Sequence, residues 1–246
     1  MWTHEESYKG RGITPYIHRK RLSFVLDLFE SLDAGAGGPV ADFGCSNGYI
    51  VSLLRRLVYK NPDRKLVGFD HSHELLALAE KREIPNAEFH PVDLNSPELD
   101  PRWRGNFDVV TCFETIEHTG RVANAFRNLY AACKTGGVIL VSMPNEKGLP
   151  GLAKYLGRKI LRRDPYGDFF DNSSEFAYFC RLVTNRSIDG FRSPARDAWG
   201  PHLGYDWERV ASSITDAYVK TGKLELQLQR GSFLNLSLFF VYRKLA

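Results

Sequence analysis

The chain of 246 residues lacks the features that mark membrane-spanning and secreted proteins. No apolar run approaches the ~20 residues that a membrane-spanning helix needs. Residues 1–6 also lack the charged and then apolar plan of a secretory signal peptide. From these absences we expect a soluble protein of the cytoplasm.

Cysteine and blocks of basic residues are scarce as well. The four cysteines lie far apart and form no C-x-x-C pair, which favours reduced thiols in an intracellular protein. They are Cys45, Cys112, Cys133 and Cys180. No run of lysine and arginine is long enough for a nucleic-acid-binding tail, so the net charge of +4 permits anionic partners without requiring them.

The remaining composition is that of a folded globular protein. Hydrophobic residues make up 43% of the chain and charged residues 25%, which excludes wholesale disorder. The sequence contains no internal repeat and no low-complexity tract. We predict a single domain over residues 1–246 that begins with a helical segment, residues 1–36, in which apolar side chains recur with a helical period from 18 to 32.

Short apolar segments then alternate with longer amphipathic ones. The short segments predict buried strands, and the longer ones predict helices between them, with Ser72 as the expected N-cap of one helix. The predicted strands are residues 40–43, 65–69, 87–91, 107–112 and 138–143, and the predicted helices are residues 49–59, 72–82 and 121–134, the last ended by Gly136 and Gly137. Strands separated by helices of this length predict βαβ units and a parallel sheet.

The last part of the sequence has a different pattern. Residues 224–229 alternate apolar and polar side chains, Gly231 and Ser232 follow, and residues 233–242 are rich in β-formers. This pattern predicts a hairpin and, with it, an antiparallel strand. The predicted fold class is α/β, a Rossmann-like, doubly wound sheet of seven strands with one antiparallel strand and an inserted lid.

The strongest motif is D-F-G-C-S-N-G-Y, residues 42–49, which follows the first strand and opens the next helix. Its glycines allow a sharp turn and a close approach to a ligand, and the helix N-terminus offers free N–H donors. Such a loop can serve NAD, FAD or S-adenosylmethionine. Two details favour the last: Asp42 lies inside the strand, where a dinucleotide fold has an apolar residue, and the spacing departs from G-x-G-x-x-G.

The motif resembles the first motif of class I S-adenosylmethionine-dependent methyltransferases, an acidic residue followed by alternating glycines, with Ser46 at the middle glycine. Asp70 follows the next strand and can accept hydrogen bonds from both ribose hydroxyls. The resemblance, which covers residues 38–145, implies that Asp93 accepts from the exocyclic amine of adenine. The predicted cofactor-binding residues are Asp42, Gly44, Cys45, Ser46, Asn47, Gly48, Asp70, His71, Asp93, Leu94, Phe113 and Glu114.

The acceptor side is predicted at residues 111–118, because the carboxyl ends of strands in an open α/β sheet face the ligand crevice. The Glu-x-x-Glu-His pattern there resembles ubiquinone-biosynthesis O-methyltransferases (methyltransferase types 11 and 23). It also resembles metal-dependent small-RNA 2′-O-methyltransferases, which implies a divalent metal held by Glu114, Glu117, His118 and His202. The first three share one face if their turn is helical. The alternative is that Glu117 and His118 cap the helix and orient the loop.

The predicted function is methyl transfer from S-adenosylmethionine to a hydroxyl of a small, sugar or lipid-linked metabolite. Catalysis of this reaction is mostly in-line positioning, helped by a base that takes the hydroxyl proton, and His118 and His202 are the candidate bases. The rival functions are a metal-dependent RNA 2′-O-methyltransferase, which no dense basic stripe supports, a non-catalytic nucleoside-binding module, and an NAD-dependent oxidoreductase.

Residues 146–204 form a segment too long for a simple loop, and we predict that they form a lid over the acceptor. Within it, residues 149–163 are basic and amphipathic, which suits either contact with an anionic membrane surface or packing of the apolar stripe on the domain. Aromatic side chains are frequent over residues 166–179. They suit an apolar or ring-bearing acceptor, or they build a small core of the lid itself.

Overall fold

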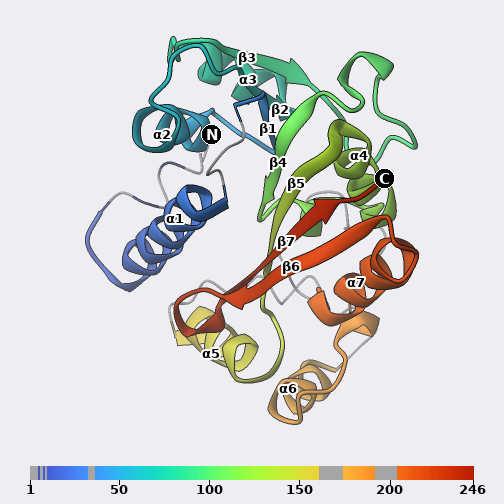
Figure 1. Ribbon diagram of the computed structural model, residues 1–246. Coiled ribbons are helices and arrows are strands. Elements are labelled where there is room, and N and C mark those ends of the chain that lie inside the picture. Colours follow the sequence, from blue (N-terminus) through green and yellow to red (C-terminus); the bar gives the residue numbers. More distant parts are fainter. Residues whose placement is uncertain (1–4, 6–7, 9, 33–36, 161–173, 192–203) are drawn as a thin grey trace.

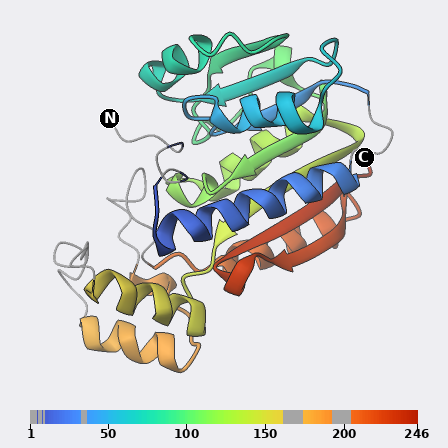
Figure 2. The same cartoon turned by 90° about the vertical axis from the view of Figure 1, so that its left-hand side faces the viewer.

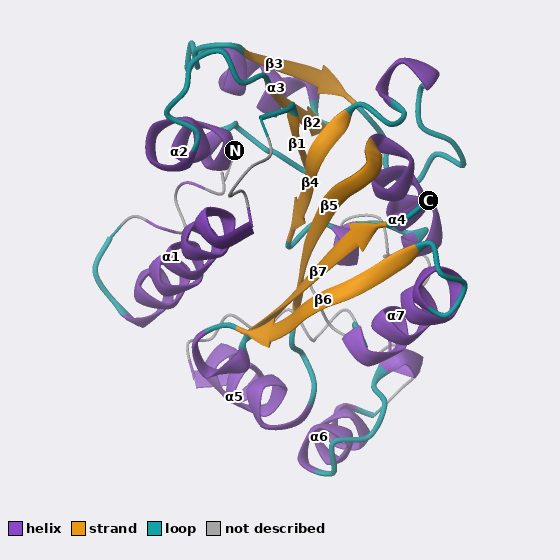
Figure 3. Ribbon diagram, viewed as in Figure 1, coloured by secondary structure: helices purple, strands orange, loops and turns teal. Residues whose placement is uncertain are grey.

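The described part of the chain forms one seven-stranded sheet with helices on both faces, as the computed structural model shows (Figures 1 and 3). The structure describes all residues except 1–4, 6–7, 9, 33–36, 161–173 and 192–203. The strands are β1 (Val40–Phe43), β2 (Leu66–Asp70), β3 (Ala87–Pro91), β4 (Phe107–Phe113), β5 (Cys133–Pro144), β6 (Leu224–Gly231) and β7 (Ser237–Lys244).

The order of the strands across the sheet is β3-β2-β1-β4-β5-β7-β6. Strands β1 to β5 pair in parallel, while β7 runs antiparallel to both β5 and β6. Parallel strands covered on both faces are buried along their length, and all four residues of β1 and all residues of β4 except Phe113 are buried. This topology confirms the doubly wound sheet with one antiparallel strand that the sequence predicts.

Two layers of helices bury the two faces of the sheet (Figures 1 and 2). Helices α1, α2 and α3 contribute to the apolar core on one face, and α4 and α7 contribute to the core on the other. Their bounds are α1 (Ile13–Leu32), α2 (Tyr49–Leu53), α3 (His73–Glu80), α4 (Val122–Ala132) and α7 (Trp207–Ile214). A π-helical turn continues α2 over Leu54–Val58, another continues α7 over Thr215–Val219, and short 3₁₀ turns cover Pro101–Trp103, Ile116–His118, Asp189–Phe191 and Phe233–Asn235.

Helix α4 ends earlier than the sequence predicts. Its last residue is Ala132, and β5 begins at once with Cys133, before the glycine pair. The backbone amides of Gly105 and Asn106, in the turn before β4, donate to the carbonyls of Ala131 and Ala132. The Lys244 ammonium donates to the carbonyl of Cys133 at 2.8 Å. Because these tertiary donors satisfy the last carbonyls, the helix needs no glycine to end it.

Helices α5 (Gly148–Ile160) and α6 (Glu175–Val183) pair with each other beyond the sheet (Figures 1 and 2). Tyr178, Leu182 and Ile188 form a small separate core between them. The predicted lid, residues 146–204, lies partly outside the described residues, so its role as a cover stays a prediction. None of the helices that the structure describes has the length and apolar character required to cross a bilayer.

Candidate functional site

The carboxyl ends of the parallel strands meet at one edge of the sheet. β1 ends at Phe43, β2 at Asp70, β4 at Phe113 and β5 at Pro144. Most of the predicted site residues lie in or after these ends, and Asp93 and Leu94 follow the end of β3 at Pro91, so the topology gathers them although they are far apart in the sequence. This edge is the usual ligand crevice of an open α/β sheet.

The glycine-rich loop turns sharply after β1 and fits against the segment that follows β4. Gly44 has a φ of 79°, and a Cβ at this position would lie 2.2 Å from the hydroxyl oxygen of Thr115. Only glycine meets both conditions. Ser46 has a φ of 52°, so this serine adopts the left-handed conformation that the glycine of the family motif adopts at little cost.

The carboxylate of Asp70 is held by backbone donors from two loops. The amide of Ser46 donates to Oδ2 at 2.8 Å, and the amide of Ser72 donates to Oδ1 at 3.0 Å. His71 Nδ1 lies 3.2 Å from Oδ1. An ionised carboxylate has about four acceptor positions, so these contacts orient Asp70 while leaving capacity for hydroxyl donors. The arrangement suits the predicted contact with ribose.

A cavity of about 170 Å³, called here the nucleoside cavity, opens beside Asp70. Phe43, Phe69 and Val92 form part of its apolar wall. Asp93 lies at its exposed rim, where Oδ1 accepts from the backbone and side-chain amides of Asn95. The predicted site residues that line it are Gly44, Ser46, Asp70, His71, Asp93, Leu94, Glu114 and His118.

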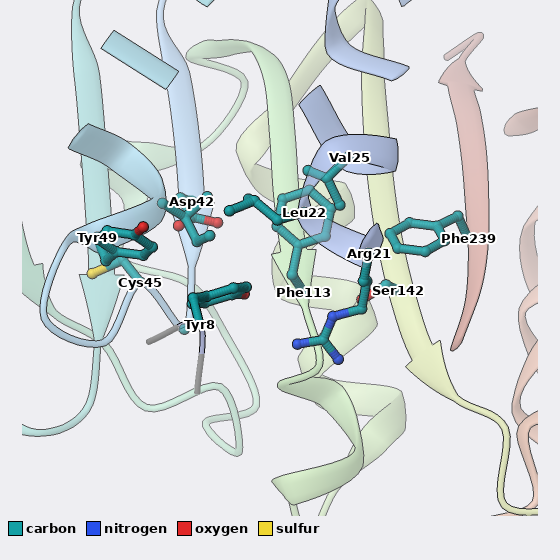
Figure 4. A pocket seen from close by; sticks show the side chains of 12 residues that line it. Tyr8, Arg21, Leu22, Val25, Asp42, Cys45, Tyr49, Phe113, Ser142 and Phe239 are labelled. Atoms are coloured by element: carbon teal, nitrogen blue, oxygen red, sulfur yellow. The ribbon is translucent and has the colours of Figure 1, made fainter. Parts of the chain in front are cut away.

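A smaller cavity of about 20 Å³ lies between α1 and the sheet and shares Gly44 with the nucleoside cavity (Figure 4). The predicted residues Asp42, Cys45 and Phe113 line it. Burial raises the pKa of Asp42 to about 7, the Thr111 hydroxyl opposes this shift by donating to Oδ1 at 2.7 Å, and the charge of Asp70 adds to it. Burial also raises the pKa of the Cys45 thiol, so this side chain stays a neutral part of the wall.

An ion pair between α1 and the end of β4 lies beside the smaller cavity. Arg21 donates to Oε2 of Glu114 at 2.8 Å, and Ser142 of β5 donates to Oε1 at 3.0 Å. Burial lowers the pKa of Arg21, but the neighbouring Glu114 carboxylate outweighs this and the pKa is raised overall. The guanidinium of Arg21 is therefore charged at neutral pH, and α1 supplies one wall of the site.

The described residues ahead of α1 close the same wall. Tyr8 is buried between the rings of His18 and Tyr49, with centroid distances of 5.9 Å and 5.4 Å. Burial, and secondarily the charge of Arg21, lowers the pKa of His18 to about 4, so the ring packs in its neutral form. The predicted residues Asn47 and Gly48 belong to the loop but line neither of the two cavities.

The predicted metal ligands Glu114, Glu117 and His118 would share one face only if their turn were helical. The segment Glu114–His118 has a different backbone conformation. Glu114 has a φ of 47° and follows β4 directly, and only Ile116–His118 form a 3₁₀ turn. The Glu117 carboxylate is buried, and its Oε1 lies 4.0 Å from Nε2 of His118. Within the described ranges, no three His, Cys, Asp or Glu side chains are grouped so that they could hold a metal ion. His202, the fourth predicted ligand, lies outside the described residues, and the metal site stays a prediction.

Tyr8, Arg21 and Ser142 line the smaller cavity and are among the residues absent from the sequence-based set. Arg21 carried a detectable signal, because it stands four residues before the buried Val25 and so falls on the apolar stripe of its helix. A charge on such a stripe requires a buried partner. Tyr8 and Ser142 stand in no pattern that the sequence alone distinguishes.

The residues around the two cavities fit S-adenosylmethionine. Gly44 lets the loop after β1 turn sharply and pack against Thr115. The oriented carboxylate of Asp70 and the exposed carboxylate of Asp93 suit a nucleoside, and the buried carboxylate of Asp42 suits a cationic group. The loop after β1 leads into the N-terminus of α2, where backbone amides are available to a ligand.

Comparisons with known proteins agree with this fit. A family model described as a methyltransferase domain matches residues 16–184. A ubiquinone biosynthesis O-methyltransferase of Albidiferax ferrireducens is 27% identical over 167 residues, which cover 64% of this chain and 64% of that relative, just under two thirds of its length. A trans-aconitate 2-methyltransferase of Acidovorax ebreus is 29% identical over 133 residues, 53% of this chain and 48% of that relative.

Solved structures share the fold. A magnesium protoporphyrin IX methyltransferase from Synechocystis PCC 6803, solved with bound SAH, superposes with a TM-score of 0.56. The alignment covers 98% of this chain and 92% of that one, at 15% sequence identity. At this identity the likeness shows the fold and carries nothing about the acceptor.

Proposed function

The chain belongs to the S-adenosylmethionine-dependent methyltransferases, and on that premise we propose that it methylates a hydroxyl group of a small-molecule acceptor. The observation that carries the proposal is the place of His118. Its side chain is 32% exposed and lines the nucleoside cavity together with Asp70, Glu114 and Thr115. This place supports His118 as the proton acceptor for a hydroxyl bound near the carboxyl end of β4.

His118 is the proposed general base. An imidazole at the rim of a cavity can take a hydroxyl proton and release it to solvent. The carboxylate of Glu117, 4.0 Å from Nε2, stabilises the imidazolium that forms. The similarity to an enzyme named as an O-methyltransferase supports a hydroxyl acceptor. We extend the proposal to sugar and lipid-linked hydroxyls, with residues 146–204 as the cover of the acceptor.

S-adenosylmethionine, when bound, supplies a methyl group on a positively charged sulfur that a nucleophile displaces in line. The residues of this chain hold and orient the reactants. Asp70 is proposed to hold the ribose and Asp93 the base. Asp42 is proposed to face the cationic end of S-adenosylmethionine across the smaller cavity. Tyr8 and α1 keep water from that end, because Tyr8, Leu22 and Val25 close it with buried side chains.

The test is a methyl-transfer assay with methyl-labelled S-adenosylmethionine and a panel of phenols, catechols and glycosides. Replacing His118 with Ala should lower kcat on the preferred acceptor by about 100-fold or more, the usual contribution of a positioned base. The affinity for SAH should stay the same, because Asp70 and the loop after β1 are unchanged. The matched control is His73→Ala, an exposed histidine at the start of α3 that lines neither site cavity.

Two results would contradict the proposal. Unchanged turnover of His118→Ala would remove the base, and label found only on nitrogen or carboxylate groups would remove the hydroxyl acceptor. The assay is repeated with EDTA and with RNA as acceptor. Label in RNA that disappears with EDTA would replace this proposal with the predicted metal site at Glu114, Glu117, His118 and His202.

A further inference from the structure

A third cavity, of about 370 Å³, lies beyond the end of β5 and is called here the distal cavity. Its walls come from the residues after β5, the start of α5, the turn after α6, the first residues of α7 and the turn before β7. It shares no lining residue with the nucleoside cavity or the smaller cavity. The polar side chains that line it include three amides, those of Asn145, Asn185 and Asn235.

Asn145 is oriented by the protein. Its side chain belongs to a residue that is 8% exposed, and Oδ1 accepts from the indole nitrogen of Trp207 at 3.1 Å and from the backbone amide of Lys147 at 3.2 Å. Both bonds are made to the oxygen, so the amide NH₂ group takes the opposite direction. Within the described part of the chain this NH₂ group donates to no protein acceptor, although it lines a cavity. An oriented donor that lines a cavity is available to the acceptor group of a ligand.

The charges that line the distal cavity cancel. The ammonium of Lys147 is paired with the carboxylate of Glu208, and Asp206 Oδ1 lies 3.9 Å from the same ammonium. No further charged side chain lines the cavity among the described residues. An anionic or cationic ligand would have to displace this ion pair, so the cavity favours a neutral one.

The apolar side chains of the cavity are mostly aliphatic. Leu149, Pro150 and Val183 contribute C–H surface, and the half-buried indole of Trp207 is the single aromatic ring among the described lining residues. A flat nucleobase favours stacking on aromatic faces. A puckered ring with C–H faces and hydroxyls around its edge instead matches aliphatic walls, one indole and planar amides that both donate and accept.

The backbone at Gly148 makes room for one of these amides, that of Asn185. Gly148 has a φ of 59°, and a Cβ there would lie 2.7 Å from Oδ1 of Asn185. The missing side chain lets the Asn185 amide approach the first turn of α5. Polar groups fixed by packing in this way discriminate between ligands by whether their hydrogen bonds are completed.

We propose that the distal cavity binds a neutral glycosyl group. This rests on the proposed function in one respect, that the glycosyl group is the distal part of the methyl acceptor. Asn145 is three residues beyond Ser142, which lines the smaller cavity, and three residues of extended chain span about 10 Å. The proposed acceptor class is thus a glycoside whose sugar ring is recognised at the distal cavity, apart from the hydroxyl that is methylated.

The test measures binding without methyl transfer. The full chain, saturated with SAH, is titrated with a panel of methyl hexopyranosides, and adenosine and cytidine serve as comparators, with saturation-transfer NMR as the readout. At least one methyl hexopyranoside should bind, with saturation of its C–H protons. Asn145→Asp keeps the oxygen that accepts from Trp207 and Lys147 but loses the donor, so the dissociation constant should rise about tenfold, the value of one hydrogen bond.

A second variant blocks the cavity without touching the core. Val183 is 54% exposed, so Val183→Trp should fold normally and abolish glycoside binding. Its matched control is Leu78→Trp on α3, at an exposed position that lines none of the three cavities. Calorimetry with SAH checks that each variant is folded.

Three outcomes would overturn the inference: no methyl hexopyranoside binds the wild-type chain, Val183→Trp binds as well as the wild type, or nucleosides bind in place of glycosides. Because no methyl donor is present, these outcomes are independent of whether His118 acts as a base. Glycoside binding without any methyl transfer to a hydroxyl would sink the proposed function and leave the distal cavity as a glycosyl site.

Discussion

The guanidinium of Arg21 lies 2.8 Å from the carboxylate of Glu114, and this contact joins α1 to the end of β4 across 93 positions of the sequence. The two side chains are 15% and 9% exposed, and Ser142 completes the hydrogen bonding of the carboxylate. A buried carboxylate without its cation is costly. The pair therefore contributes to holding α1 on the sheet, and Arg21 forms part of the wall of the smaller cavity.

Replacing Arg21 with Met should lower the free energy of unfolding by about 3 kcal/mol, because Glu114 is left as a buried and unpaired charge. Urea unfolding of the unliganded protein measures this. The double variant R21M/E114Q should recover part of the loss, since the remaining amide is neutral and keeps a partner in Ser142. A double variant that is no more stable than R21M would show that packing of the guanidinium, and not charge pairing, holds α1.

Replacing Asp42 with Asn should change how stability depends on pH. Burial raises the pKa of Asp42 from 3.8 to about 7 in the folded state, so the folded protein binds a proton that the unfolded chain has released. The resulting stabilisation is fully present below about pH 4 and is lost as the pH rises through 7. Asp42→Asn has no carboxyl group to titrate and therefore does not lose this stabilisation. At 1.36 kcal/mol for each pKa unit, the variant should be up to about 4 kcal/mol more stable than the wild type at pH 8.

Urea unfolding from pH 4 to 8.5, without cofactor, measures the effect. The control is Asp63→Asn, an exposed aspartate whose replacement should leave the wild-type profile in place. Parallel profiles for Asp42→Asn and the wild type would mean that the Asp42 carboxyl is solvated in the unliganded protein.

Replacing Ser46 with Gly should stabilise the unliganded protein by about 1 kcal/mol, because a non-glycine residue with left-handed φ carries strain of this order. Thermal unfolding measures the gain. Glu83 has a similar φ of 49° outside both site cavities, so Glu83→Gly should give a similar gain and serves as the control. A loss of stability in Ser46→Gly alone would show that the serine hydroxyl makes a contribution larger than the strain.

Replacing Glu146 with Gln should loosen α5. The Glu146 carboxylate is buried and pairs with Lys154 Nζ and Arg158 Nη1, each at 3.0 Å, so the amide would leave two cations with a weaker partner. We expect a cost of about 3 kcal/mol to the packing of α5, seen as faster hydrogen exchange over residues 148–160 and unchanged exchange in β1 and β4. The control, Glu175→Gln, breaks a half-exposed pair with Lys159 and should cost less than about 1 kcal/mol.

The elements with a strong local signal were predictable from the sequence. The strands have apolar runs that do not depend on distant residues, the hairpin of β6 and β7 has its own alternation, and Ser72 caps α3 by accepting from the Leu75 amide at 3.3 Å, as predicted. The residues that gather at the nucleoside cavity were predictable for the same reason, because strand ends in a parallel sheet meet whatever the details of packing.

What the sequence did not reveal depends on contacts between distant segments. The hydroxyl of Ser142 accepts a hydrogen bond from the Glu114 amide at 3.0 Å. Glu114 takes a left-handed φ and a 3₁₀ turn follows, in place of the helical turn that a shared face of Glu114, Glu117 and His118 would require. The early end of α4 depends on donors from other segments, the backbone amides of Gly105 and Asn106 and the ammonium of Lys244. Arg21 belongs to the site only because α1 packs on the sheet.

The position of β7 has a consequence for synthesis of the protein. β7 is the last strand along the chain, yet it fills the gap between β5 and β6, and Phe239, Phe240 and Val241 are buried on its two faces. Until these residues leave the ribosome, one edge of β5 is unpaired and both apolar cores are incomplete, a state open to wrong partners.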